Sequence, residues 1–141
     1  MVRLGHTIGK ALERGALVLL NGELGTGKTF LARAIARAQG VPGSIPITSP
    51  TFALVHEYST PRGALLHVDL YRIADTPDLD VEVARLGLFE ARMAGAMLLV
   101  EWGKRACPWL GGNVTLEVTL SMNPAGRVVE LTGPMAKELV S

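Results

Sequence analysis

Residues 22–29 read Gly-Glu-Leu-Gly-Thr-Gly-Lys-Thr and match the pattern G-x-x-x-x-G-K-[ST] of a phosphate-binding loop. Glycines let the backbone curl until successive N–H groups point at phosphate oxygens, and a helix that follows adds the positive end of its dipole. In such a loop Lys28 reaches the β- and γ-phosphates, and the Thr29 hydroxyl binds Mg²⁺. A merely tight strand-to-helix turn explains one glycine, not three followed by Lys-Thr. We therefore expect nucleotide binding, and we favour ATP over GTP because the chain has no Asn-Lys-x-Asp sequence.

The residues expected to contact the nucleotide belong to this loop and to the first turn of the helix after it. They are Glu23, Leu24, Gly25, Thr26, Gly27, Lys28, Thr29 and Phe30. Lys28 is also expected to be catalytic, because a cation placed at the phosphates stabilises the charge of the transferred group.

A phosphate-binding loop needs an acidic side chain to hold Mg²⁺ or its waters, and two acids end buried strands. Residues 65–69 end in Asp69 and residues 97–101 end in Glu101. Ligands of an open α/β sheet bind beyond the carboxyl ends of its strands, although either acid also fits a solvated residue that begins a loop. Strand alternation puts His67 on the face of Asp69, so His67 is a candidate to orient Asp69 or a water.

A second hydroxyl-bearing segment, Ser49-Pro50-Thr51-Phe52, comes where nucleotide-sensing switch loops often lie. A hydroxyl of Ser49 or Thr51 could meet the γ-phosphate or Mg²⁺. Equally, Pro50 could end a loop and Thr51 begin a strand.

Hydrophobic periodicity predicts the elements that position these residues. Helices are expected over residues 7–14, 30–38 (with Phe30, Leu31, Ala34, Ile35 and Ala38 as the apolar stripe), 81–93 and, as one turn, 135–141. Strands are expected over residues 16–20, 52–58, 65–69, 97–100, 114–120 and 128–131. This order predicts an α/β fold, a single P-loop NTPase domain over residues 1–141, with a mainly parallel central sheet, antiparallel hairpin edges and flanking helices.

Composition excludes several classes of protein. Of the 141 residues 48% are hydrophobic and 19% charged, which argues against disorder, and the net charge of +1 gives no sign of a strongly basic nucleic-acid-binding protein. The single cysteine, Cys107, favours a reducing compartment. Residues 94–100 form the longest apolar run and are too short to span a membrane, so we expect a cytoplasmic protein.

Several motifs occur in one order along the chain: the phosphate-binding loop, Ser-Pro-Thr-Phe at 49–52, His-Val-Asp-Leu-Tyr-Arg at 67–72 and Glu-Trp at 101–102. In this combination the chain resembles the bacterial TsaE (YjeE) family, from about Leu4 to Arg127. The resemblance implies an Mg²⁺-dependent ATPase that works with the TsaB–TsaD heterodimer, which transfers a threonylcarbamoyl group to adenosine 37 of tRNAs reading ANN codons. Hydrolysis of ATP would reset that complex between rounds, and tRNA would be met through the partners.

The resemblance also implies roles for single residues. Glu101 corresponds to the second Mg²⁺-binding residue beside Thr29, Asp69 to the acid needed for hydrolysis, and Arg127 to an arginine near the nucleotide. The family usually carries about ten further residues before Leu4, including a threonine near the adenine whose place falls at Met1 here. The segment between Arg72 and Gly87 is a few residues longer than usual.

Two other functions stay open on the residues alone: a small-molecule kinase with the same loop, and a nucleotide-gated binding module in which hydrolysis is incidental. The length leaves little space for the lid and acceptor pocket of a kinase. Arg72 could contact tRNA, a partner or phosphate, or it could simply be an exposed arginine after a strand. Trp102 could pack over the site or belong to the core. Arg85 and Arg92 are expected on a solvated helix face with Glu82 and Glu90.

Overall fold

A six-stranded mixed sheet forms the centre of the fold across residues 1–140, which are the residues that the computed structural model describes. Its strands are β1 (Leu17–Asn21), β2 (Val55–Thr60), β3 (Gly63–Asp69), β4 (Met97–Glu101), β5 (Leu116–Asn123) and β6 (Gly126–Thr132). In the order β2-β3-β4-β1-β5-β6, the four inner strands are parallel, and β2 and β6 pair antiparallel at the edges. The predicted fold class, mainly parallel with antiparallel hairpin edges, is confirmed.

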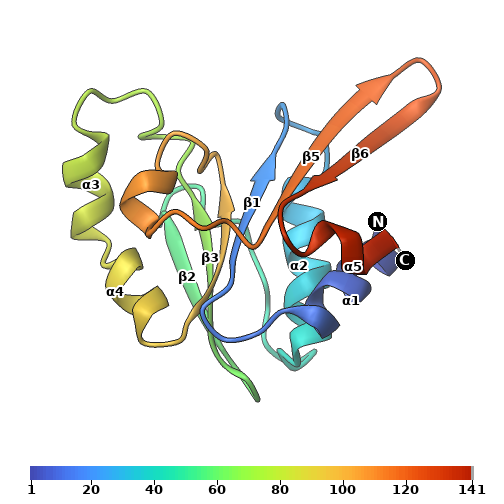
Figure 1. Cartoon of the computed structure of the whole chain (residues 1–141), viewed down its shortest axis with the longest axis horizontal. Helices are drawn as coiled ribbons and strands as arrows, with labels where there is room; N and C mark the ends of the chain where they lie inside the picture. The colour runs from blue at the N-terminus through green and yellow to red at the C-terminus, as the bar shows by residue number, and fades with distance from the viewer. Residues whose placement is uncertain (141) are drawn as a thin grey trace.

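Helices cover both faces of this sheet (Figure 1). One layer holds α1 (Val2–Ala11), α2 (Lys28–Gln39) and α5 (Ala136–Val140), and the other holds α3 (Leu79–Arg85), α4 (Leu88–Met93) and the 3₁₀ helix η1 (Cys107–Leu110). Among the described residues, no helix is long and apolar enough to cross a membrane.

Strand alternation divides the core into two layers. Val18 and Leu20 of β1 point into the α1–α2 layer, whereas Leu17 and Leu19 point into the α3–α4 layer. The same alternation places Leu65 of β3 toward α2, so every second residue after it along β3 faces α2 as well. The sheet is therefore buried on both sides, which explains the unbroken apolar runs of its inner strands.

The elements differ from the predicted ones mainly where glycine or tertiary packing intervenes. The first helix lies earlier than predicted, at Val2–Ala11, and the predicted helix over 81–93 is two helices separated at Gly87, whose φ is 67°. The strand predicted from residue 52 begins at Val55, because residues 51–53 form a turn. The last turn is α5, and Ser141 lies outside the described residues.

Packing against α1 explains the burial pattern of α2. A Cβ on Gly9 would lie 2.5 Å from the Ala38 Cβ, so only glycine lets the two helices approach this closely. The predicted apolar stripe is wrong for Phe30, which is 48% exposed.

Arg92 is buried rather than part of a solvated face, so that prediction is wrong. Its guanidinium donates to four carbonyl oxygens, those of Gly15, Leu110, Gly112 and Asn113, at 2.7–2.9 Å. Burial lowers its pKa from the usual value, with a smaller opposing effect of the Cys107 thiol. Arg85, by contrast, is exposed and pairs with Glu82, as predicted for a surface helix. Arg92 thus joins α4 to the loops that precede β1 and β5.

Removal of the Arg92 side chain should cost about 3 kcal/mol of unfolding free energy, since it leaves four carbonyl groups without their donor. The Arg85→Ala variant removes an equal charge from the surface and should change the unfolding free energy by less than about 0.5 kcal/mol. Urea unfolding of Arg92→Ala and Arg85→Ala measures both values. Equal, small changes would contradict the structural role of Arg92.

Candidate functional site

The loop between β1 and α2 has a backbone conformation that favours glycine at three places. Gly22 has φ 146°, Gly25 has φ 82° and Gly27, the residue before α2, has φ 104°. A Cβ on Gly22 would also lie 2.5 Å from the Leu120 carbonyl oxygen and 2.7 Å from the Thr26 hydroxyl. The spacing of these glycines in the sequence therefore reflects both the turn and the close contact of the loop with β5.

Lys28 stands in the first turn of α2 with its side chain folded back over this loop. Its ammonium group donates to the carbonyl oxygens of Gly22 and, at 3.0 Å, of Glu23. Burial lowers the pKa of Lys28 from its usual value, and the nearby carboxylates, those of Glu101, Asp69 and Glu23, oppose this shift. A buried cation that has only carbonyl partners is suited to receive a stronger, anionic acceptor such as phosphate.

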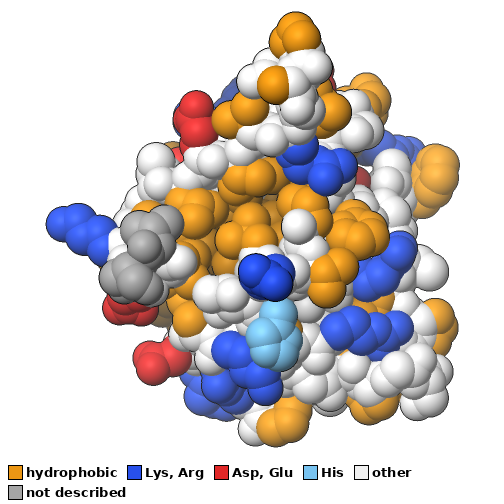
Figure 2. Space-filling model, turned by 90° about the vertical axis from the view of Figure 1, so that its right-hand side faces the viewer, with side chains coloured by type: hydrophobic (Ala, Val, Ile, Leu, Met, Phe, Trp, Pro, Cys, Tyr) orange, Lys and Arg blue, Asp and Glu red, His pale blue; other side chains and the backbone are white. Residues whose placement is uncertain are grey.

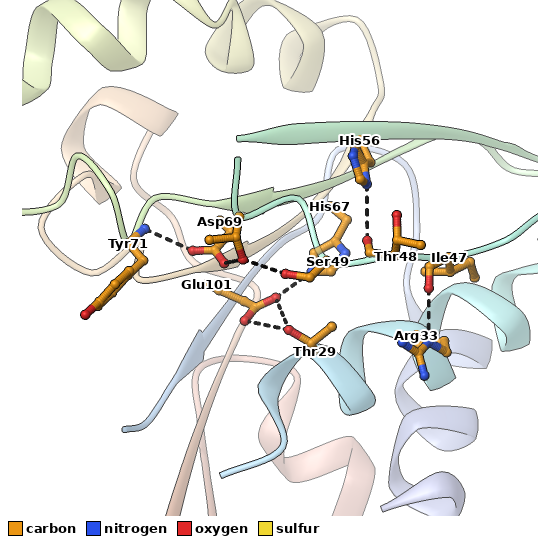
Figure 3. A network of polar contacts seen from close by, with 11 residues as sticks. Thr29, Arg33, Ile47, Thr48, Ser49, His56, His67, Asp69, Tyr71 and Glu101 are labelled. Carbon is orange, nitrogen blue, oxygen red and sulfur yellow. Dashed lines mark hydrogen bonds and ion pairs between the residues drawn. The ribbon is translucent and has the colours of Figure 1, made fainter. Parts of the chain in front are cut away.

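Thr29, Glu101 and His67 form a connected polar network at the carboxyl end of the sheet (Figure 3). The Thr29 hydroxyl lies 3.2 and 3.1 Å from the two carboxylate oxygens of Glu101. The His67 Nε2 lies 2.6 Å from Glu101 Oε2, and since a carboxylate only accepts, Nε2 carries the hydrogen. His67 Nδ1 is buried and has no hydrogen-bond partner within residues 1–140.

Of the two alternatives given for His67, orientation of Asp69 or of a water, the structure does not show the first, because its hydrogen-bond partner is Glu101. The strand register explains the difference: β3 and β4 run parallel, with His67 opposite Leu99 and Asp69 opposite Glu101. His67 thus reaches diagonally across to Glu101, while its neighbour on the same face, Asp69, lies beyond it at the strand end. The prediction from alternation within β3 alone could not include a partner on β4.

Asp69 is held by the loop at residues 49–54. Its carboxylate accepts the Tyr71 backbone N–H at 2.9 Å and the Thr51 hydroxyl at 3.2 Å, and Ser49 Oγ lies 2.7 Å from Thr51 Oγ1. The Asp69 N–H in turn donates to the Leu54 carbonyl oxygen at 2.9 Å. Of the two interpretations of Ser49 and Thr51, the structure agrees with the one that places their hydroxyls at the site, because Thr51 lies in a turn before β2.

Two aromatic residues add a wall: Trp102, for which the sequence left the site and the core open, and Tyr71, which it did not single out. The Trp102 ring lies 4.5 Å from the Lys28 ammonium group and 5.0 Å from the Tyr71 ring. Trp102 has φ 60°, a left-handed conformation that is uncommon for a bulky residue. The sequence feature that indicated a place for Trp102 at the site is its position directly after Glu101. For Tyr71 the only such feature is its closeness to Asp69 in sequence.

A cleft of about 390 Å³ opens between these groups and joins the predicted residues. Its walls include Gly25, Gly27, Lys28, Thr29, Asp69 and Glu101, together with Leu24 and Phe30. A cation, loop N–H groups and two carboxylates thus face one space, which is the donor and acceptor set that a nucleotide phosphate with Mg²⁺ requires.

The acidic residues fit Mg²⁺ only together with a phosphate. No three His, Cys, Asp or Glu side chains of residues 1–140 come close enough to form a metal site of their own. The Thr29 hydroxyl and the Glu101 carboxylate supply two oxygen ligands at one point. Mg²⁺ prefers this arrangement, since it keeps several waters and commonly takes its other ligands from substrate phosphates.

The remaining predicted residues lie around the rim. Glu23 is exposed and contributes its carbonyl oxygen, which accepts the Thr26 hydroxyl at 2.7 Å. Arg127, on the β5–β6 hairpin, donates from Nε to the Thr26 carbonyl oxygen at 3.0 Å and thus lies against the loop. Arg72 donates to the Phe52 carbonyl oxygen at 3.3 Å, so it touches the 49–54 loop.

Known proteins match this chain along most of its length. Residues 1–129 match the family described as threonylcarbamoyl adenosine biosynthesis protein TsaE. TsaE of Aquifex aeolicus is 37% identical over 106 residues, which cover 75% of this chain and 71% of that protein. TsaE of Mycobacterium tuberculosis (strain H37Rv) is 43% identical over 106 residues, which cover 72% of this chain and 61%, about three fifths, of that protein.

A solved structure supports the same fold. The crystal structure of Bacillus subtilis YdiB superposes with a TM-score of 0.73 and covers 98% of this chain and 82% of that chain, at 23% sequence identity. At 23% sequence identity this similarity shows a shared fold and says nothing of function.

The hydrogen bond from His67 should orient the Glu101 carboxylate for Mg²⁺, because an outer partner fixes the direction of a metal ligand. His67→Ala should raise the Mg²⁺ concentration required for nucleotide binding by about 10- to 100-fold. His67→Gln keeps a donor and should restore most of the affinity. Trp102 fluorescence during Mg²⁺ titration, with ATP present, measures the effect.

Urea unfolding of the two variants separates orientation from stability. Equal Mg²⁺ requirements in His67→Ala and the parent protein would show that the contact does not orient Glu101. The same conclusion would follow if His67→Gln and His67→Ala, at equal stability, required equal Mg²⁺ concentrations for nucleotide binding.

Proposed function

Because the chain belongs to the TsaE family of threonylcarbamoyl adenosine biosynthesis proteins, we propose that it binds and hydrolyses ATP as one Mg²⁺-dependent domain. Its place is the modification of tRNA, where it supports the TsaB–TsaD heterodimer in threonylcarbamoylation of adenosine 37 of tRNAs reading ANN codons. The single observation that carries the ATPase proposal is the convergence of Lys28, Thr29, Asp69 and Glu101 on one cleft.

Binding of the triphosphate rests on the loop and on Lys28. Loop N–H groups and the N-terminus of α2 supply fixed donors, and Lys28 moves its hydrogen bonds from the Gly22 and Glu23 carbonyl oxygens to phosphate oxygens. Trp102 beside Lys28 keeps the cation partly out of water, which strengthens its attraction for an anion. Arg127 and Phe30 complete the binding surface at the rim.

Thr29 and Glu101 hold the metal, and Asp69 acts on water. Bound Mg²⁺ neutralises negative charge on the phosphate oxygens. The Glu101 carboxylate is oriented from behind by His67, so its free lone pairs point at the Thr29 hydroxyl. Asp69, fixed by the Tyr71 N–H and the Thr51 hydroxyl, keeps acceptor capacity to orient a water and take its proton during attack on the γ-phosphate.

The 49–54 loop gives hydrolysis a means of affecting partners. Its Thr51 hydroxyl touches Asp69, and Phe52 at its tip is 84% exposed. A change at the γ-phosphate could therefore reach a surface residue through Asp69 and Thr51, and this connection is the basis on which we propose a role in resetting the TsaB–TsaD complex between rounds. The family membership and the names of the relatives, all in tRNA threonylcarbamoyladenosine biosynthesis, support the place of this protein in that modification.

The test of partner dependence is ATP turnover by the pure protein, alone and with TsaB–TsaD plus tRNA. We expect stimulation by the complete mixture and a loss of at least about 100-fold in Lys28→Ala, which removes the cation at the phosphates. Brisk turnover that requires a small acceptor would overturn the proposal in favour of a kinase. Tight ATP binding without turnover in any mixture would favour a binding module.

The two acids should affect different steps. Asp69→Asn should lower kcat by about 10²- to 10⁴-fold while the affinity for Mg²⁺ and ATP stays near that of the parent protein, since Asp69 acts on the water. Glu101→Gln should instead raise the Mg²⁺ requirement for both binding and turnover. Steady-state kinetics at several Mg²⁺ concentrations distinguishes the variants, and identical profiles would contradict the division of roles.

A further inference from the structure

Acidic and basic residues are unequally distributed along this chain. Residues 1–12 and 24–56 contain five Lys or Arg and not one Asp or Glu. The rest of the chain contains nine Lys or Arg against thirteen Asp or Glu. The net charge of +1 is therefore the sum of a positive and a negative part, and it conceals the segregation.

The fold brings the two acid-free stretches together. They form α1, α2 and the loop after α2, which pack as one layer on one side of the sheet, whereas many of the acids lie on and around α3 and α4 on the other side (Figure 1). In Figure 2, Lys and Arg side chains gather around a histidine on the α1 side, and carboxylates lie toward the margins of the view. We call this surface the basic face and define it by its four cations, Arg3, Lys10, Arg33 and Arg37; the exposed His6 lies on α1 between the first two.

The cations of the basic face form two rows. On α1, Arg3 and Lys10 are seven residues apart, about 10 Å along the helix, with His6 between them. On α2, Arg33 and Arg37 are four residues apart, about 6 Å along the helix. A groove of about 380 Å³ runs between the rows, with Phe30 at its end nearest the nucleotide loop. None of these cations pairs with a carboxylate in the part of the chain that the structure describes.

Arg33 and Arg37 are also held in place by the loop that follows α2. Arg33 donates from Nε to the Ile47 carbonyl oxygen at 3.1 Å, and Arg37 donates to the carbonyl oxygens of Val41 and Pro42. A guanidinium group has five N–H donors, so each arginine keeps donors for another acceptor. These bonds reduce the conformational freedom that an external anion would otherwise have to restrict.

We propose that the basic face binds the phosphate backbone of tRNA directly. This inference goes beyond the proposed function, in which tRNA is reached through TsaB–TsaD, and rests on it only for the identity of the RNA. Charges of one sign, spaced one to two helical turns apart in each row and without interspersed acids, match a polymer that carries a phosphate at every nucleotide. An acidic protein surface is the alternative partner, but it would offer carboxylates at irregular spacing and does not call for uninterrupted cations. The expectation that this protein lacks a basic surface of its own is thus revised.

Arg3 and Lys10 are the residues to change, because neither side chain donates a hydrogen bond within residues 1–140 and neither belongs to the nucleotide cleft. The Arg3→Gln/Lys10→Gln double variant should bind an in vitro transcribed tRNA about 10-fold more weakly than the parent protein at low salt, with the slope of log affinity against log salt reduced by about 1.4 to 1.8. Fluorescence anisotropy of labelled tRNA over a series of salt concentrations measures both.

The matched control is Arg85→Gln/Lys104→Gln, which removes the same charge from exposed positions outside the basic face and should leave affinity and slope unchanged. Basal ATP turnover of both double variants should equal that of the parent protein. ATP turnover thus tests the ATPase proposal, and tRNA affinity tests the basic face, in two independent measurements. The inference is overturned if the parent protein does not bind tRNA, or if both double variants lose affinity equally. It is also overturned if Arg3→Gln/Lys10→Gln keeps tRNA affinity but loses stimulation by TsaB–TsaD, which would assign the face to an acidic protein surface.

Discussion

Parallel pairing of β3, β4 and β1 is the constraint on which the candidate site depends. Parallel strands all end at the same edge of a sheet, so Asp69 pairs directly with Glu101, and Glu101 pairs with Leu20, two residues before the phosphate-binding loop. The two acids therefore reach one cleft although they are far apart in sequence. Alternation then decides the face: both acids point to the side of the sheet that α2 covers, where Lys28 and Thr29 begin the helix.

Burial of the polar groups gives this arrangement its rigidity. Glu101 and His67 are almost wholly buried, and a buried carboxylate is costly unless its oxygens are hydrogen-bonded. The contacts to His67 and Thr29 satisfy it and at the same time join β3, β4 and α2. Arg92 has a comparable structural role on the other side of the sheet, where one guanidinium satisfies carbonyl groups of three segments.

Sequence patterns predicted the local features well and the contacts between elements less well. The loop, the strand ends and the hairpin edges each depend on neighbouring residues, and their prediction agreed with the fold. The differences concern contacts between elements: His67 contacts Glu101 on β4 rather than Asp69 on its own strand, and Arg92 is buried rather than solvated. Both outcomes depend on a second element, β4 for His67 and the loops before β1 and β5 for Arg92, whose position cannot be predicted from the periodicity of one segment.

The sequence by itself determined which chemistry is available, because a Gly-rich loop with Lys-Thr and acids at two strand ends require no knowledge of the fold to be recognised. Only the tertiary structure decided how these groups meet: which acid His67 contacts, that Trp102 lies beside Lys28, and that the 49–54 loop reaches Asp69. The net charge shows the same division. A sum over the chain is independent of position, whereas the basic face exists because packing places the acid-free helices α1 and α2 side by side.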